Sequence, residues 1–331
     1  VAAADRIAKW DGSGWSALAS GISTSVPGIT SVVTALVHDG VELYVGGLFT
    51  DAGAVAADNI ASWNGSAWSA LGSGIDGSYV SPIYALLLDG SDLYVGGIFS
   101  NAGGVSAADS IAKWDGSNWS ALGVGINGTG VSVRALLLEG GELYVGGNFK
   151  NVGGVAAADN IAKWDGSNWS AVGPGIAGAY SHVYALAYEG GTLYAGGSFR
   201  NAGGVAEADK IARWDGTAWT ALGSGIKADL IYALSFDGPE LYIGGRFDSV
   251  GGKPSSHLAL WREPRIISPV NNSTFSSAQQ SFTWSASGAS VSEWAFELTD
   301  TATNTVLFSV TGLGTFNLST IATGLPTDGR E

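Results

Sequence analysis

The sequence predicts an all-β protein: a five-bladed β-propeller of four-stranded antiparallel blades, followed by a partial C-terminal β-sandwich. First, the text "LYVGGIFSNAGGV" at 93–105 recurs in five variants, whose tyrosines lie 48 to 50 residues apart: Tyr44, Tyr94, Tyr144, Tyr194 and Tyr242. Second, glycine accounts for 51 of the 331 residues, about twice its usual share, while hydrophobic residues still reach 46%. A period of this length is typical of repeat folds, and abundant glycine favours turn-rich β structure.

One repeat, 83–122, contains four short apolar segments separated by turns. The segment "IYALLLDG" at 83–90 is almost entirely apolar, so we expect an inner strand that is buried on both faces. "LYVGGIF" at 93–99 follows an Asp-Gly turn as the second strand, and "IAKW" at 111–114 and "WSALG" at 119–123 form the third and fourth. One such meander cannot bury both faces, whereas five stacked around an axis can, as in a β-propeller.

The phase of the repeats predicts how the ring closes. The sequence motif of the third strand occurs six times, whereas the motifs of the other strands occur five times each, because the chain begins in the middle of a repeat. We therefore assign 1–262 to the propeller and expect the N-terminal strand at 15–18 to complete the sheet begun by 231–236. The extra third strand leaves 7–10 and 258–261 as competitors for one position, and an upstream repeat is the alternative explanation.

Tryptophan and glycine at repeated positions are predicted to serve packing. Ten of the 13 tryptophans occupy the third- and fourth-strand positions of five repeats, so inter-blade packing is favoured over a dedicated sugar platform. Gly96-Gly97 and its repeats should lie where a side chain would strike the next blade or distort the end of the strand. None of these glycine pairs opens a helix, so no phosphate-binding loop is indicated.

These residues carry a resemblance. "LYVGG", "IAKWDGS" and "NWSAL" resemble the kelch pattern, and very similar arrays occur in bacterial secreted proteins. The resemblance covers Val1 to about Trp261 and implies a propeller related to that of galactose oxidase. The copper site of that enzyme needs a cysteine cross-linked to tyrosine, and this chain has no cysteine, so the resemblance does not imply the oxidase activity. The five-fold count also resembles the architecture of the five-bladed lectin tachylectin-2.

The repeat pattern stops after Trp261. "REPRIISPV" reads as a short, stiff linker, and the segments after it alternate apolar and polar residues as in an antiparallel sandwich. "SPVNNSTF", "FTWSA" and "GLPTDGR" resemble immunoglobulin-like or fibronectin-III-like modules of bacterial proteins. In such modules two further strands follow "LPTDGR", so we interpret 263–331 as a truncated module. A fragment of a longer protein is favoured over a neighbouring chain that supplies the missing strands.

Composition excludes several classes of function. The net charge is −14, which disfavours nucleic acid and anionic membrane as partners, and no apolar run is long enough to span a bilayer. The absence of cysteine excludes disulfides, thiolate metal sites and a cysteine nucleophile. The absence of methionine as well fits a secreted or extracellular protein, with Val1 as a processed terminus or the start of a fragment.

No catalytic, cofactor or metal site is predicted. The three histidines, His38, His182 and His257, lack a second ligand at metal-binding spacing. Nine carboxylates occupy repeated turn positions, which are Asp39, Asp89, Glu139, Glu189 and Asp237 in the first turn and Asp11, Asp115, Asp165 and Asp215 in the second. Another set precedes the third strand and is expected to bind loop amides: Asp5, Asp58, Asp109, Asp159 and Asp209. A catalytic pair should instead break the repeat symmetry.

The connections between repeats vary most, and the loops between second and third strands should share their face of the ring. Ligands commonly bind on such loops, so the candidate ligand-binding residues are Tyr79, Tyr180, Asn101, Asn151 and Asn201. We expect a secreted, non-enzymatic structural or interaction protein of a cell surface, matrix or extracellular assembly, which binds through the propeller loops and the C-terminal module. Its partners would be other protein subunits or a surface polymer. A multivalent carbohydrate-binding lectin is the alternative, followed by a glycosidase-like enzyme.

Overall fold

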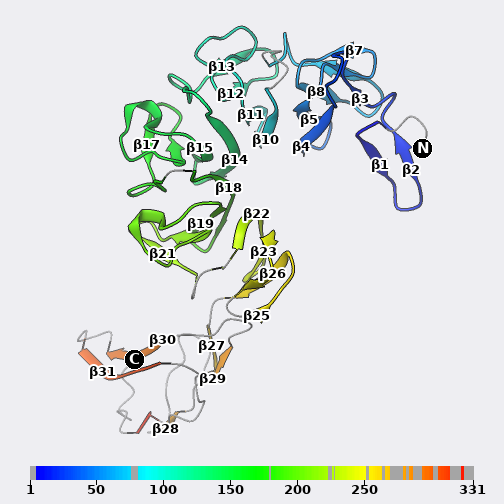
Figure 1. Ribbon diagram of the computed structural model, residues 1–331. Helices are drawn as coiled ribbons and strands as arrows, with labels where there is room; N and C mark the ends of the chain where they lie inside the picture. Colours follow the sequence, from blue (N-terminus) through cyan, green and yellow to red (C-terminus); the bar gives the residue numbers. More distant parts are fainter. Residues whose placement is uncertain are drawn as a thin grey trace. The chain divides into compact units, whose positions relative to one another are not determined.

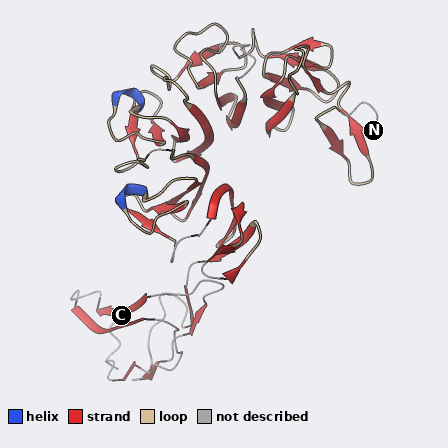
Figure 2. Ribbon diagram, in the orientation of Figure 1, coloured by secondary structure: helices blue, strands red, loops and turns tan. Residues whose placement is uncertain are grey.

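The computed structural model describes residues 5–75, 81–178, 180–222, 226, 228–250, 253–262, 265–268, 279–280, 283–285, 293–300, 305–313 and 322–323. The chain divides into two compact units, Val1–Thr220 and Ala221–Glu331, and each is described by itself. The predicted all-β class is confirmed, since the described elements are β-strands apart from two single-turn 3-10 helices (Figures 1 and 2).

The first unit contains four-stranded antiparallel sheets whose strands follow one another in sequence order, as predicted for propeller blades (Figure 1). The first consists of β4 (Val32–His38), β5 (Leu43–Leu48), β8 (Ile60–Trp63) and β9 (Trp68–Ala70). The second consists of β10 (Ile83–Asp89), β11 (Asp92–Gly97), β12 (Ile111–Trp114) and β13 (Trp119–Ala121). The third consists of β14 (Ser132–Glu139), β15 (Glu142–Asn148), β16 (Ile161–Trp164) and β17 (Trp169–Ala171). The fourth consists of β18 (Val183–Glu189), β19 (Thr192–Gly197), β20 (Ile211–Trp214) and β21 (Trp219–Ala221).

Shorter elements accompany these blades. An N-terminal hairpin pairs β1 (Ala8–Trp10) with β2 (Trp15–Ala17). A small sheet joins β3 (Ile22–Ser23), from the connection that precedes the first blade, to β6 (Asp51–Ala52) and β7 (Val55–Ala56), from the loop between the second and third strands of that blade. The corresponding loops of the third and fourth blades contain the 3-10 helices η1 (Val152–Gly154) and η2 (Ala202–Gly204), coloured blue in Figure 2.

The second unit begins with the fifth repeat, which has three paired strands, as predicted from the sequence. These are β22 (Ala228–Asp237), β23 (Glu240–Phe247) and β26 (Leu258–Arg262), with a short hairpin of β24 (Ser249–Val250) and β25 (Lys253–Pro254) between them. Further pairs are β27 (Arg265–Ser268) with β29 (Thr283–Ser285), β28 (Gln279–Gln280) with β32 (Ala322–Thr323), and β30 (Glu293–Asp300) with β31 (Thr305–Leu313). The sandwich arrangement of 263–331, the boundary after residue 262 and ring closure by the N-terminal strand stay predictions.

A β-bulge in each inner strand explains the second glycine of the first pair in the repeat. In the second blade Ile83 lies opposite Gly97 and Ala85 lies opposite Gly96, so Tyr84 is an extra residue in the inner strand. A Cβ atom on Gly97 would lie 2.5 Å from the Pro82 carbonyl oxygen, so the bulge needs glycine opposite it.

The other glycine of the pair sets the contact with the next blade. A Cβ atom on Gly96 would lie 2.4 Å from Cγ1 of Val133, which belongs to the neighbouring inner strand. Gly46 and Gly146 make the corresponding approach to Ile83 and Val183, at 2.6 Å in both cases. The predicted structural role of the pair is therefore confirmed for these blades, with a different steric reason for each glycine.

Substitution of either glycine should destabilise the fold. Gly97→Val should lower the free energy of unfolding by about 1–3 kcal/mol, because the side chain collides with the backbone of the bulge. Gly96→Val should have an effect of the same order through the neighbouring blade. Gly14→Ala is the control, since a Cβ atom there meets nothing within 4 Å. Urea unfolding measures the differences, and a neutral Gly97→Val variant would contradict this account.

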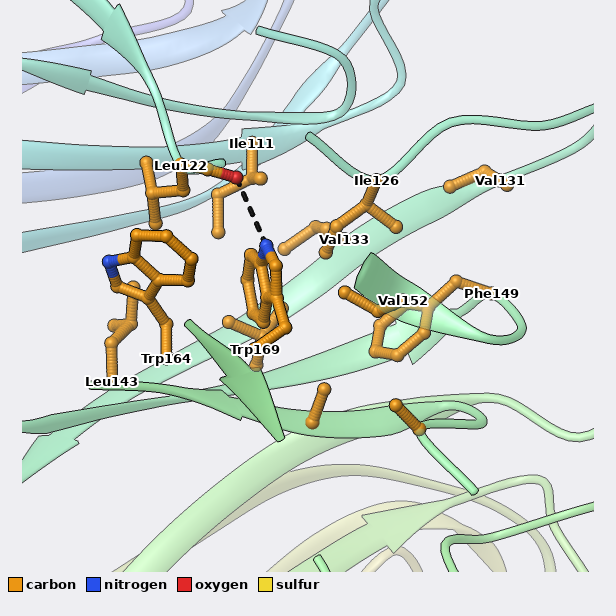
Figure 3. Packing of buried hydrophobic residues seen from close by; sticks show 13 residues of the cluster. Ile111, Leu122, Ile126, Val131, Val133, Leu143, Phe149, Val152, Trp164 and Trp169 are labelled. Atoms are coloured by element: carbon orange, nitrogen blue, oxygen red, sulfur yellow. Dashed lines mark hydrogen bonds between the residues drawn. The ribbon is translucent and has the colours of Figure 1, made fainter. Parts of the chain in front are cut away.

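The hydrophobic core lies between adjacent blades and contains the predicted tryptophan packing. Figure 3 shows Ile111 and Leu122 of the second blade against Val133, Phe149 and Trp169 of the third. The indole Nε1 of Trp169 donates a 3.0 Å hydrogen bond to the Leu122 carbonyl (Figure 3). The same bond recurs from Trp68 to Leu18, from Trp119 to Leu71 and from Trp219 to Val172.

The first glycine of the second pair is explained by these indoles. Gly53, Gly103, Gly153 and Gly203 have φ angles near +60°, and a Cβ atom on each would lie within 3 Å of the fourth-strand tryptophan of the same repeat. A side chain is therefore excluded there both by backbone conformation and by space.

The N-terminal hairpin departs from the tryptophan pattern. The rings of Trp10 and Trp15 are tilted at 49° with a centroid distance of 5.4 Å, like the other pairs, but they are 50% and 61% exposed, whereas Trp169 is 8% exposed. Among the described residues of this unit, no sheet covers these two indoles with the carbonyl and apolar neighbours that their equivalents have.

Trp169→Phe should lower the free energy of unfolding by about 1–3 kcal/mol, because it removes a buried hydrogen bond and part of the buried indole volume, while the Leu122 carbonyl keeps only its bond from the Gly125 N–H. Trp15→Phe is the matched substitution at the same repeat position, and at 61% exposure it should be nearly neutral. In a ring closed by the N-terminal strand, Trp15 would be enclosed and the two losses would be similar. Denaturant unfolding of both variants therefore also tests ring closure.

Candidate binding site on the loops

Backbone hydrogen bonds hold the two predicted classes of loop together at one end of the blades. The loop between second and third strands donates from a glycine N–H to a carbonyl of the connection that precedes its blade. The bonds run from Gly53 to Gly21 at 2.8 Å, from Gly103 to Gly74 at 2.9 Å and from Gly203 to Gly175 at 3.1 Å. The prediction that these loops share a face is thus confirmed for these three repeats.

The fourth blade carries an open hollow between its two loops, with a volume of about 770 Å³. We call it the loop hollow. Its lining comes from the connection between β17 and β18 and from the loop between β19 and β20: Pro174, Gly175, Ala177, Gly178, Tyr180, Ser181, Ser198, Arg200, Asn201, Gly203 and Gly204. Two of the predicted ligand-binding residues, Tyr180 and Asn201, therefore lie in one site.

Tyr180 is held in an unusual conformation on the rim. Its side chain is 89% exposed, and its φ of +64° is uncommon for a residue other than glycine. The Ser198 hydroxyl donates to the Tyr180 carbonyl at 3.3 Å, and the His182 Nδ1 atom lies 3.2 Å from the same oxygen. Local backbone strain of this kind concentrates at functional sites, which makes the exposed ring a candidate contact.

Asn201 and Arg200 add polar groups to the same hollow. Asn201 has φ +51°, and its backbone N–H donates to the Asp209 carboxylate at 2.9 Å, which fixes the start of η2. Both side chains are exposed, and among the described residues neither the Asn201 amide nor the Arg200 guanidinium has a hydrogen-bond partner. The hollow thus combines an aromatic face, a cation and an amide, which suits a polar ligand with an apolar surface.

The remaining predicted residues are distributed over other repeats. Asn151 occupies the position of Asn201 in the third blade, with φ +52° and the same bond from its N–H to an aspartate, Asp159. Asn101 in the second blade is partly buried and does not share this backbone conformation. Tyr79 lies outside the described residues. The structure therefore does not bring the five candidates together in a single site.

Several residues of the site were not predicted from the sequence. Arg200, Ser181 and Ser198 line the hollow, and His182 contacts Ser198 with 3.3 Å between Nδ1 and Oγ. Burial lowers the pKa of His182, and nearby Arg134 lowers it further. A usable signal was present, because His182 and Arg200 differ from the residues at the same positions of the neighbouring repeats.

The carboxylates at the second turn are structural, as predicted. The Asp215 carboxylate accepts hydrogen bonds from the N–H groups of Thr217 and Ala218, each at 2.8 Å, and these bonds, with the Thr217 hydroxyl, lower its pKa to about 2. Corresponding bonds from the turn amides lower the pKa of Asp11 to about 2 and lower those of Asp115 and Asp165. At the equivalent position Asn64 accepts the same bonds with its amide oxygen.

Other acids also have structural partners. Asp92 pairs with Lys113 at 2.8 Å, Glu142 pairs with Lys163 at 2.7 Å, and Glu240 pairs with Arg262. Among the described residues no group of three metal-ligating side chains gathers, and no helix is long and apolar enough to cross a bilayer.

No protein-family model and no curated protein sequence matches the chain. Similar solved structures are β-propeller proteins. One is the extracellular domain of a hybrid two-component system from B. thetaiotaomicron, 12% identical with a TM-score of 0.46, covering 75% of this chain. This chain spans 30% of that protein's chain. The computationally designed protein Ika8 is 15% identical over 88% of this chain and 90% of its own, with a TM-score of 0.38. Ycf48 bound to a D1 peptide is 15% identical over 73% of this chain and 69% of its own, with a TM-score of 0.40.

The turn aspartates predict a loss of stability in acid. Their pKa values are lower in the folded protein than the ordinary value of 3.8, so their contribution is complete above about pH 4 and disappears as pH falls toward about 2. Unfolding in urea should be followed between pH 2 and 6. The variant Asp11→Asn, Asp115→Asn, Asp165→Asn, Asp215→Asn should fold, as Asn64 indicates, and should lose less stability in acid. An unchanged acid profile in that variant would contradict the assignment.

Proposed function

We propose that this protein is a secreted, non-enzymatic interaction protein of a cell surface, matrix or extracellular assembly. The loop hollow is the contact site for another protein subunit or a surface polymer. The observation that carries the proposal is the combination at one hollow of a strained, exposed tyrosine with two unpaired polar side chains, Arg200 and Asn201. The absence of both cysteine and methionine supports an extracellular location.

The placement of the acids supports a binding role over catalysis. Hydrolysis of a glycosidic bond uses two carboxylates that face the substrate. The lining of the loop hollow contains no aspartate or glutamate, and the turn aspartates are saturated by backbone N–H groups. A carboxylate held in this way at a low pKa is a weak general acid or base at neutral pH.

Carbohydrate binding is the second candidate, favoured by the exposed ring of Tyr180. A tyrosine face can stack on the apolar side of a sugar while neighbouring polar groups bind its hydroxyls. Asn151 repeats the backbone geometry of Asn201 in the third blade, which would allow more than one related site. A protein partner would instead bind at the loop hollow of the fourth blade alone.

Binding measurements with matched variants test the proposal. Immobilised surface polysaccharides and extracellular proteins should be screened with the wild-type protein and with Tyr180→Ala. We expect at least one saturable partner whose affinity falls about tenfold or more in Tyr180→Ala. The control is Val41→Ala, an exposed apolar residue in the turn at the other end of β4 and β5.

Two outcomes would overturn the proposal. Turnover of a glycoside that is abolished by a single carboxylate substitution would make the protein an enzyme. Equal loss of binding in Tyr180→Ala and Val41→Ala would place the contact elsewhere.

A further inference from the structure

The bulged residues of three neighbouring inner strands form a stack of planar side chains. The bulge position carries Thr34, Tyr84, Arg134 and Tyr184 in successive blades of the first unit. The Arg134 guanidinium carbon lies 4.2 Å from the ring centroid of Tyr84 and 5.3 Å from that of Tyr184. Arg134 is thus held between two tyrosines from different blades, which is a favourable cation–π geometry.

A fourth planar group continues this stack toward the loop hollow. The His182 ring is stacked on Tyr184 with 5.6 Å between centroids and an interplanar angle of 9°. His182 also contacts Ser198, which lines the loop hollow. We call Tyr84, Arg134, Tyr184 and His182 the arginine stack.

The orientation of Arg134 leaves its donors available. Its Nε atom donates to the hydroxyl of buried Ser132 at 3.2 Å, which fixes the plane of the guanidinium. The two Nη groups have no acceptor among the described residues, and they are not among the buried polar atoms that lack a partner. Arg134 is partly exposed, so these groups remain available as a pair of parallel donors, the arrangement that binds one carboxylate in a bidentate manner.

Arg134 also breaks the symmetry of the repeats. The other bulge residues of the first unit are threonine or tyrosine, and the inner strands are otherwise almost uncharged up to their final turn. Packing alone would be served by a tyrosine at this position, as in the blades on either side. A β-bulge redirects a side chain and is frequent next to binding sites.

From this geometry we propose that the arginine stack is a binding site for a single carboxylate group on a small or otherwise neutral ligand, such as a sugar acid or an acidic amino-acid residue. The two Nη groups of Arg134 donate to the two carboxylate oxygens, and Tyr84 and Tyr184 hold the guanidinium flat. Burial lowers the pKa of His182, which is therefore largely neutral near pH 7. Arg134 is then the one cation of the stack, and its charge matches a single carboxylate. Polyanions and dianionic phosphate fit less well, since the whole chain carries a net charge of −14.

The test uses the full chain and measures binding by calorimetry and by ligand-observed NMR. The probes are glucuronate, the α-amide of N-acetylglutamate, whose one ionised group is the side-chain carboxylate, glucose as the uncharged counterpart of glucuronate, and inorganic phosphate. We expect glucuronate or the α-amide of N-acetylglutamate to bind at least tenfold more tightly than glucose and phosphate, and the stronger of the two identifies the source of the carboxylate. Failure of both acids to bind, or tighter binding of phosphate, would overturn the proposal.

Variants separate ligand binding from a structural role of the stack. Arg134→Gln should weaken binding at least tenfold, and Arg134→Lys should weaken it severalfold, because lysine keeps the charge and loses the bidentate fork. Lys9→Gln removes the same charge from the exposed N-terminal hairpin and should bind like the wild type. If Arg134→Lys folds with unchanged stability and binds like the wild type, Arg134 serves packing and the proposal is wrong.

The variant Tyr180→Ala distinguishes carboxylate binding at the arginine stack from partner binding at the loop hollow. That variant removes the exposed ring of the loop hollow and leaves the arginine stack intact. Carboxylate binding should therefore survive in Tyr180→Ala, and its loss there would overturn the assignment to Arg134.

Discussion

The close approach of neighbouring inner strands at glycine is the constraint on which the blades depend. Gly46, Gly96 and Gly146 leave the space into which Ile83, Val133 and Val183 of the following blades project. Each of these β-branched residues is completely buried at that junction. A larger residue at the glycine would separate the inner strands, and the indole hydrogen bonds and loop contacts farther out would lose their geometry as a consequence.

The outer part of each junction is fixed by a different interaction. There the fourth-strand tryptophan of one blade donates to a carbonyl at the end of the fourth strand of the blade before it, as Trp119 does to Leu71 at 2.9 Å. The inner contact is steric and the outer contact is a directed hydrogen bond, so together they define both the spacing and the rotation between blades. The loop hollow is built on this frame, since its two walls are joined by the bond between Gly203 and Gly175.

Much of the fold could be predicted because every repeat has the same pattern of strands and turns. The repeat length of about 50 residues identified the blades, the apolar segments identified the inner strands, and Asp-Gly and similar dipeptides identified the turns. The bulge could not be read in this way, because an extra residue in a strand such as "IYALLLD" leaves the apolar pattern intact. The exposure of Trp10 and Trp15 was also missed, because burial depends on a neighbouring blade and not on the local sequence.

The candidate site was predicted only in part, for a related reason. Tyr180 and Asn201 were found as loop residues, but their common hollow depends on how two loops fold against each other. The contacts of Arg134 join residues about 50 positions apart in three blades, and no spacing rule within one repeat reports them. The signal that could have identified Arg134 is its departure from the repeat: a charged residue in a strand whose equivalents are apolar, aromatic or hydroxylic at that position.

The indole hydrogen bonds all run in one direction along the chain, from each blade to the one before it. Every internal junction therefore presents the same donor surface on one side and the same acceptor surface on the other. A whole blade could be excised or duplicated as a cassette, and the two surfaces brought together by that change would still be complementary. The same interchangeability allows a blade to dock on the wrong neighbour while the chain folds, so near-identical repeats such as 111–121 and 161–171 are the places where misassembly would begin.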